Sequence, residues 1–182
     1  FFWDCKMRKI NFMKMVASGN DFVVIENGHT SHVTRHRSLA KGICDRKFGI
    51  GADGLLILEK SKVANIRMRI FNPDGSEAEM CGNGARCVAL YCVRNQKPEH
   101  RNQIKIETKA GVIKSEVKGE NIKVKLTDPK DIRLGIPLRF KGRTMKVDFI
   151  NTGVPHVVIF VGEINLIDVE GLGRWVPVSY TH

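Results

Sequence analysis

The sequence contains no apolar run that could cross a membrane. Its longest such run, residues 157–161, is far shorter than the ~20 residues that a membrane-spanning helix needs. The first residues also lack the apolar segment and small-residue cleavage site of a signal peptide. The five cysteines are an odd number, and Cys81, Cys87 and Cys92 lie too close together for an evident disulfide framework. We therefore expect a cytoplasmic protein without a membrane partner.

Basic residues outnumber acidic ones, but they are not concentrated in one segment. The 30 Lys and Arg against 19 Asp and Glu give a formal net charge of +11, which on its own is compatible with a nucleic-acid-binding module. However, the sequence has no basic arm and no basic stripe interleaved with aromatic residues. The densest basic run, 35–47, also carries Leu39 and Ile43 at helical spacing, typical of an amphipathic helix with a solvated basic face. We therefore predict no nucleic-acid partner.

Hydrophobic periodicity predicts an α+β fold with enough length, at 182 residues, for a real core. Helices are expected at about 34–47 and about 83–95, the second apolar nearly all round and therefore central. Strands are expected at 10–15, 22–25, 55–58, 66–70, 104–108, 112–117, 122–126, 145–149 and 157–161. The pattern predicts a sheet wrapped around one buried helix.

The run Met80-Cys81-Gly82-Asn83-Gly84 places a thiol in a glycine-flanked turn directly before that central helix. A helix beginning there directs unpaired N–H groups and a partial positive charge at Cys81 and at any anion beside it. Such a setting lowers the pKa of a thiol towards neutrality, which predicts a thiolate that can take a proton. The two glycines would let a substrate approach the backbone. The alternative is a glycine-rich turn with an incidental cysteine.

Three motifs occur in order: SGNDFVV at 18–24, FGIGADGLL at 48–56 and RIFNPDGSEAEMCGNGARC at 69–87. Together they resemble the N-terminal half of the diaminopimelate epimerases, cofactor-independent enzymes that convert LL- to meso-diaminopimelate in lysine and cell-wall precursor synthesis. The resemblance runs from about Met7 to about Arg174. It implies an α+β fold in which a mixed, mostly antiparallel sheet surrounds a central buried helix, followed by a second, similar domain. It also implies a homodimer and no cofactor.

Epimerisation at Cα needs a base on one face of the substrate and an acid on the other. By resemblance, Cys81 is one of two catalytic thiols, and the N–H groups of Gly82, Asn83 and Gly84 hold the substrate carboxylate. The family's second Cys-Gly-x-Gly turn does not occur in these 182 residues, so we expect the chain alone to be inactive. No lysine lies in a recognisable pyridoxal motif, and His32 and His36 lack a third ligand, so neither a cofactor nor a metal is predicted.

Three further residues are assigned by the resemblance. Asn20 and Asn72 match substrate-binding asparagines, and His156 matches a histidine near the catalytic thiols. Each has a plainer interpretation: a loop asparagine, the first residue of an Asn-Pro-Asp-Gly turn, and a packed or exposed histidine. Val154 stands where many members have a substrate-contacting asparagine, which places one contact to the distal carboxylate in doubt.

The Thr127-Asp128-Pro129 segment predicts a domain boundary. We expect an epimerase domain at 7–127 and the start of a second one at 128–174. Residues 1–6 are expected to be upstream read-through, and 175–182 a non-native tail. Two other functions stay open: another cofactor-independent racemase of the same fold, such as a proline or histidine racemase, and a non-catalytic small-molecule or nucleic-acid-binding module.

Overall fold

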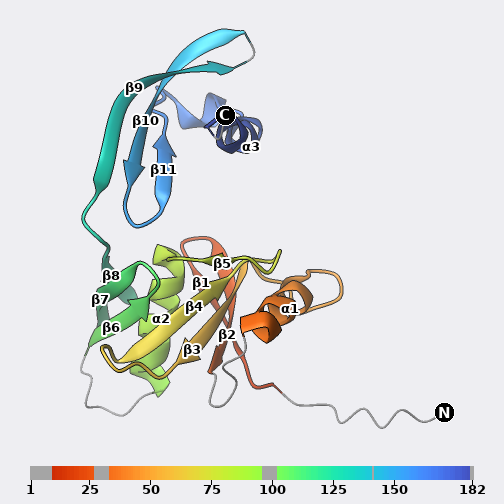
Figure 1. The fold of residues 1–182 in the computed structure, drawn as a ribbon, viewed down its shortest axis with the longest axis vertical. Helices are drawn as coiled ribbons and strands as arrows, with labels where there is room; N and C mark the ends of the chain where they lie inside the picture. Colours follow the sequence, from red (N-terminus) through yellow and green to blue (C-terminus); the bar gives the residue numbers. More distant parts are fainter. Residues whose placement is uncertain (1–9, 27–32, 96–101, 141, 181–182) are drawn as a thin grey trace, which may run out of the picture. The chain divides into compact units, whose positions relative to one another are not determined.

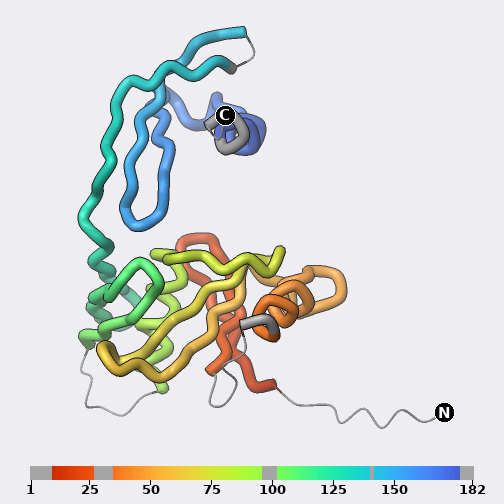
Figure 2. Tube along the Cα trace, in the orientation of Figure 1, coloured from red at the N-terminus to blue at the C-terminus, as the bar shows by residue number. Residues whose placement is uncertain are grey.

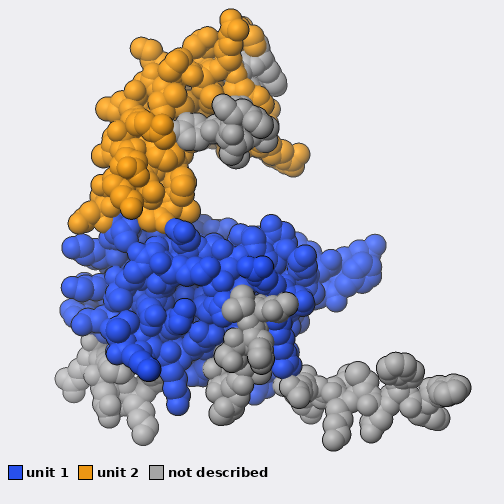
Figure 3. Space-filling view, viewed as in Figure 1, with its two compact units in different colours: residues 1–127 blue, residues 128–182 orange. Residues whose placement is uncertain are grey.

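A computed structural model describes residues 10–26, 33–95, 102–140 and 142–180. The chain divides into two compact units, residues 1–127 and residues 128–182 (Figure 3). The expected read-through at 1–6 lies outside the described residues. Within the described residues, no helix is both long enough and apolar enough to span a membrane.

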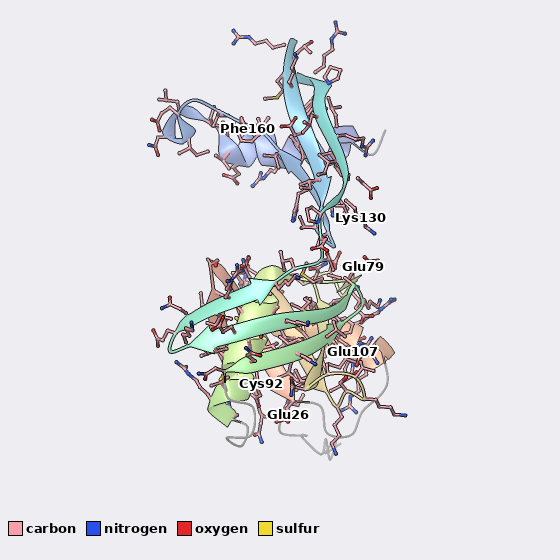
Figure 4. All side chains as sticks on the ribbon, turned by 90° about the vertical axis from the view of Figure 1, so that its left-hand side faces the viewer. Glu26, Glu79, Cys92, Glu107, Lys130 and Phe160 are labelled. Atoms are coloured by element: carbon pink, nitrogen blue, oxygen red, sulfur yellow. The ribbon has the colours of Figure 1, made fainter. Side chains whose placement is uncertain are left out.

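The first unit is a mixed sheet that surrounds one helix. The sheet has the strand order β1-β2-β3-β4-β6-β7-β8, with β5 paired to β4, and only the β2–β3 and β4–β6 pairs are parallel. Helix α2 contacts strands from both ends of this order, and Figure 4 shows it behind β6–β8. The fold expected from the sequence is therefore confirmed. The strands and helices are β1 Met13–Ala17, β2 Asn20–Glu26, α1 Val33–Cys44, β3 Gly54–Glu59, β4 Ile66–Phe71, β5 Glu77–Ala78, α2 Gly82–Asn95, β6 Gln103–Thr108, β7 Gly111–Lys118 and β8 Asn121–Lys125.

Strands β2 and β3 are buried on both faces, which explains their continuous apolar runs. Alternate residues of β2 and β3 pack with Ala40 and Cys44 of α1, and the residues between them face α2. Figure 1 shows α1 outside the sheet and α2 among its strands. The side chains facing α1 are Val23, Ile25, Leu55 and Ile57.

The turn between β1 and β2 positions one candidate residue. Ser18 and Gly19 both have positive φ, 48° and 88°, the geometry of a two-residue hairpin turn. This turn pairs Ala17 with Asn20, so Asn20 is the first residue of β2. As the first residue of a buried strand, Asn20 has its backbone held by the sheet, whereas its side chain is half-exposed.

The second unit is a three-stranded antiparallel sheet with a helix. Strand β10 lies between β9 and β11, and α3 packs Val176 against Leu138 and Val147 of the sheet, with Trp175 beside them. Figure 2 follows the chain along the long β9–β10 hairpin and through β11 to α3. The bounds are β9 Lys130–Phe140, β10 Arg143–Asn151, β11 Pro155–Val158, a 3-10 turn at Ile164–Leu166, and α3 Val169–Tyr180.

Several elements differ from the sequence predictions. Helix α1 ends at Cys44 rather than near 47, because the Asp45 carboxylate accepts hydrogen bonds from the N–H groups of Lys47 and Phe48 and turns the chain. The apolar run at 157–161 is a strand only to Val158, and Phe160 is 84% exposed. Strands β5 and β9 and helix α3 were not expected.

Candidate active site

Cys81 is the N-cap residue of α2. Its carbonyl oxygen accepts the first helical hydrogen bond, from the Ala85 N–H at 2.9 Å, and its Sγ accepts one from the Gly84 N–H at 3.4 Å. The thiol is therefore a side-chain cap for one of the N–H groups that a helix leaves without a backbone partner. The N–H groups of Gly82 and Asn83, in the same first turn, have no carbonyl of a preceding turn to bind.

The two glycines of this turn serve different purposes. A Cβ on Gly84 would lie 3.2 Å from Leu56 Cδ2, so Gly84 lets α2 pack closely on β3. At Gly82 a Cβ would meet only ordinary contacts, 3.6 Å from Arg86 Nη1 and 3.8 Å from Leu126 Cδ2. Gly84 is buried and Gly82 is half-buried. Only Gly82 therefore leaves the backbone accessible in the way expected from the sequence.

Asn20 and Asn83, 63 residues apart in the sequence, are hydrogen-bonded to each other. The Asn83 Nδ2 donates to Asn20 Oδ1 at 2.8 Å, and the Asn20 Nδ2 donates to Asp53 Oδ2 at 3.1 Å. At the other end, Arg86 Nη1 donates to Asn83 Oδ1 at 2.8 Å. The structure thus brings the β1–β2 turn, the loop before β3 and the first turn of α2 to one place.

An ion cluster lies next to the two asparagines. Arg46 Nη2 lies 2.8 Å from Asp21 Oδ1 and 2.7 Å from Asp53 Oδ1, and Lys14 Nζ lies 2.9 Å from Asp21 Oδ2. Lys14 also donates to the Gly51 carbonyl. Hydrogen bonds from Arg46 and Lys14 hold the pKa of Asp21 well below its usual range. The cluster joins β1, β2 and the α1–β3 loop by opposite charges.

The other described cysteines are buried. Burial raises the pKa of Cys87 to about 11 and that of Cys92 to about 12, and it also raises the pKa of Cys44. All four described cysteines are free thiols, and Cys81 is the half-buried one. Cys44, Cys87 and Cys92 are therefore core residues.

Asn72 bonds within its own turn, and His156 belongs to the second unit. Asn72 Nδ2 donates to Ser76 Oγ at 2.9 Å, and its backbone N–H and carbonyl bond Ser76 and Gly75, so it stabilises its own turn. Its side chain is exposed, and contact with a substrate stays a prediction. His156 is exposed on β11 of the second unit, and Val154 is half-buried in the turn before it.

Sequence reasoning missed Asp53, Arg86, Arg46 and Asp21. Asp21 follows a candidate residue directly, and Arg86 lies three positions after Asn83 on a helix, so helical spacing alone could have found it. Asp53 and Arg46 reach the site through tertiary contacts. Among the described residues, no group of three or more His, Cys, Asp or Glu is placed to hold a metal ion.

Solved structures of racemases and epimerases share this fold. A probable proline racemase from Agrobacterium radiobacter matches with a TM-score of 0.68 and 16% identity, covering 87% of this chain and 54% of that one. A hydroxyproline epimerase from Agrobacterium vitis matches with a TM-score of 0.65 and 14% identity, covering 86% and 52%. At such identities the likeness establishes the fold alone, an α+β fold of the kind found in these racemases and epimerases.

Closer relatives establish the family. The family model for diaminopimelate epimerase matches residues 12–132. The diaminopimelate epimerase of Carboxydothermus hydrogenoformans is 41% identical over 95% of this chain, and that of Methanocella arvoryzae is 44% identical over 89%. The chain belongs to the diaminopimelate epimerase family. It spans 67% and 62% of the lengths of these two relatives.

Proposed function

We propose that Cys81 is one of two thiols by which the whole protein interconverts LL- and meso-diaminopimelate, in lysine and cell-wall precursor synthesis. The observation that carries this proposal is the position of Cys81 as the N-cap of α2, next to Asn20 and Asn83. A thiol there can lie beside a carboxylate that is bound by the first turn of the helix. Relatives that match most of the chain are named as diaminopimelate epimerases, which supports the choice of substrate.

Removal of the Cα proton leaves a carbanion that must be stabilised through the adjacent carboxylate. The first turn of α2 contains no acidic residue, and Arg86 lies beside Gly82. The N–H groups of Gly82 and Asn83, the helix dipole and this guanidinium would all favour an anion. These groups would supply by electrostatics what a pyridoxal cofactor supplies in other racemases.

Inversion of configuration also requires a proton donor on the opposite face of the substrate. We propose that this donor is the thiol of a second Cys-Gly-x-Gly turn in the C-terminal half of the family. Only the turn at Cys81 occurs in this sequence, so the 182-residue chain by itself should not turn over diaminopimelate. His156 is proposed to assist the thiols, and the whole protein is proposed to be a homodimer.

A second candidate is another racemase of the same fold, acting on proline or a related amino acid. This second candidate is supported by the fold match to a proline racemase and a hydroxyproline epimerase. Incubating the intact protein in D2O with LL-diaminopimelate, L-proline and L-histidine, and following Cα deuteration by NMR, separates these candidates. Exchange with proline but not with diaminopimelate would overturn the first proposal.

The role of the thiol is tested in the intact protein with Cys81→Ala. Loss of an acid–base group should lower kcat by about 10²–10⁴-fold. Cys87→Ala is the matched control, because Cys87 is on the same helix but is buried in the core. Conversion of LL- to meso-diaminopimelate that survives in Cys81→Ala, or that is lost equally in the control, would refute the assignment. Turnover by the 182-residue chain alone would refute the requirement for a second thiol.

A further inference from the structure

The side chains of Asn20 and Asn83 are two links in a hydrogen-bonded chain with a charged group at each end. The chain runs from Arg86 Nη1 to Asn83 Oδ1, from Asn83 Nδ2 to Asn20 Oδ1, and from Asn20 Nδ2 to Asp53 Oδ2. The three distances are 2.8, 2.8 and 3.1 Å. Every bond in it runs in the same donor-to-acceptor direction.

The charged ends determine which way each amide faces. A guanidinium has only donors, so Asn83 must turn its oxygen towards Arg86 and its NH2 group towards Asn20. A carboxylate has only acceptors, so Asn20 must turn its NH2 group towards Asp53 and its oxygen towards Asn83. Both ends therefore require the same orientation. Reversing either amide would set two oxygens or two NH2 groups against each other.

Asp53 is itself held on several sides. Its Oδ1 accepts from Arg46 Nη2 at 2.7 Å, and its Oδ2 also accepts from the Asp21 N–H at 3.2 Å. Its own N–H donates to Asp21, both to the backbone carbonyl at 2.9 Å and to Oδ1 at 3.0 Å. The carboxylate that orients Asn20 is therefore fixed to the hairpin that carries Asn20.

Each amide uses one of its two N–H groups within the chain, so each keeps one N–H for a ligand. The half-buried end of α2 then offers these amide donors together with the backbone N–H groups of Gly82 and Asn83. We propose that Asp53 and Arg86 are positioning residues that hold the amides of Asn20 and Asn83 in the orientation that receives a substrate carboxylate. The identity of that substrate rests on the proposed function.

Substitutions that permit amide reversal test this proposal in the intact protein. Asp53→Asn keeps the shape of the side chain but adds donors, and Arg86→Gln adds an acceptor, so each allows both orientations. We expect KM for LL-diaminopimelate to rise about tenfold in each variant. In Asp53→Asn kcat should change less than threefold, whereas in Arg86→Gln the loss of the guanidinium charge should lower kcat as well. Arg86→Lys still has only donors, and its KM should stay within threefold of the wild-type value. Asp148→Asn is the control, because the Asp148 carboxylate belongs to the second unit and accepts from the Gly135 N–H.

A second readout does not depend on activity. In the 15N-labelled 182-residue chain, Asp53→Asn should shift the side-chain NH2 resonances of both Asn20 and Asn83, although Asp53 is hydrogen-bonded to Asn20 and reaches Asn83 through it. A shift confined to Asn20 would overturn the proposed series of hydrogen bonds. An unchanged KM, or a KM raised equally in Arg86→Lys and Arg86→Gln, would overturn it as well. If the intact protein fails to act on diaminopimelate while both amides shift, the proposed function is wrong but the positioning of the amides is supported.

Discussion

The contact between Gly84 and Leu56 determines how closely the turn that carries Cys81 packs on the sheet, and replacing both residues tests it. Leu56 on β3 is fully buried, and a methyl group on Gly84 would lie 3.2 Å from its Cδ2 and 3.6 Å from Cys81 Cβ. The methyl group in Gly84→Ala would therefore push against a side chain that has little room to move.

The expected free-energy changes have opposite signs in the two backgrounds. In the wild type, overpacking costs about 1–3 kcal/mol and the helix preference of alanine returns about 1 kcal/mol. Gly84→Ala should therefore destabilise the first unit by up to about 2 kcal/mol. Leu56→Ala alone should cost about 2–5 kcal/mol, because it leaves a cavity. Within that variant the cavity accepts the methyl group, and Gly84→Ala should then stabilise the unit by about 1 kcal/mol.

Native-state hydrogen exchange with mass spectrometry measures these changes unit by unit. Peptides from β3 and α2 report the first unit, and peptides from β9 and β10 provide an internal reference. Gly42→Ala is the matched control, because Gly42 is in α1 and a Cβ there meets nothing within 4 Å. That substitution should have the same small effect in both backgrounds. If Gly84→Ala were also equally destabilising in both, the Leu56 contact would not be the reason for glycine at this position.

Two further predictions concern the buried ion pair of the first unit and the cysteines of α2. Glu77 and Arg69 form a buried bidentate pair, at 2.8 and 3.0 Å, so Glu77→Gln should destabilise the first unit by about 3 kcal/mol in urea unfolding at pH 7. Burial raises the pKa of Glu77, but Arg69 and Lys109 together lower it below 4.5, so the wild type should lose this stability as pH falls below 4.5. This loss should be absent in Glu77→Gln. Curves of unfolding free energy against pH that run parallel in the wild type and in Glu77→Gln would contradict this. In the native protein, iodoacetamide should modify Cys81 before Cys87 and Cys92, which burial protects; peptide mapping that found Cys92 modified first would contradict the placement of α2.

The prediction of the central helix and its strands succeeded where local pattern and burial agree. The apolar run at 87–93 was expected to be buried, and it forms the second half of α2 up to the last two residues. Strand β9 escaped prediction although apolar residues recur at every second position from Ile132 to Phe140, because Gly135 and Pro137, residues that are depleted in strands, lie between them. Its pairing with β10 supplies the hydrogen bonds that form it. The run at 157–161 was predicted too long. Its pairing with β10 ends at Val158, and hydrophobicity does not show where a partner strand ends.

The sequence by itself determined the family, the thiol at the start of a buried helix, and Asn20 and Asn83 as candidate residues. These follow from local motifs whose spacing along the chain is enough to identify them. Tertiary structure decided which of them meet, because Asn20, Asp53 and Asn83 come from three separate segments that only the folded sheet brings within hydrogen-bonding distance. The tertiary structure also explains the glycine at position 84, because the contact with Leu56 exists only after α2 has packed on β3.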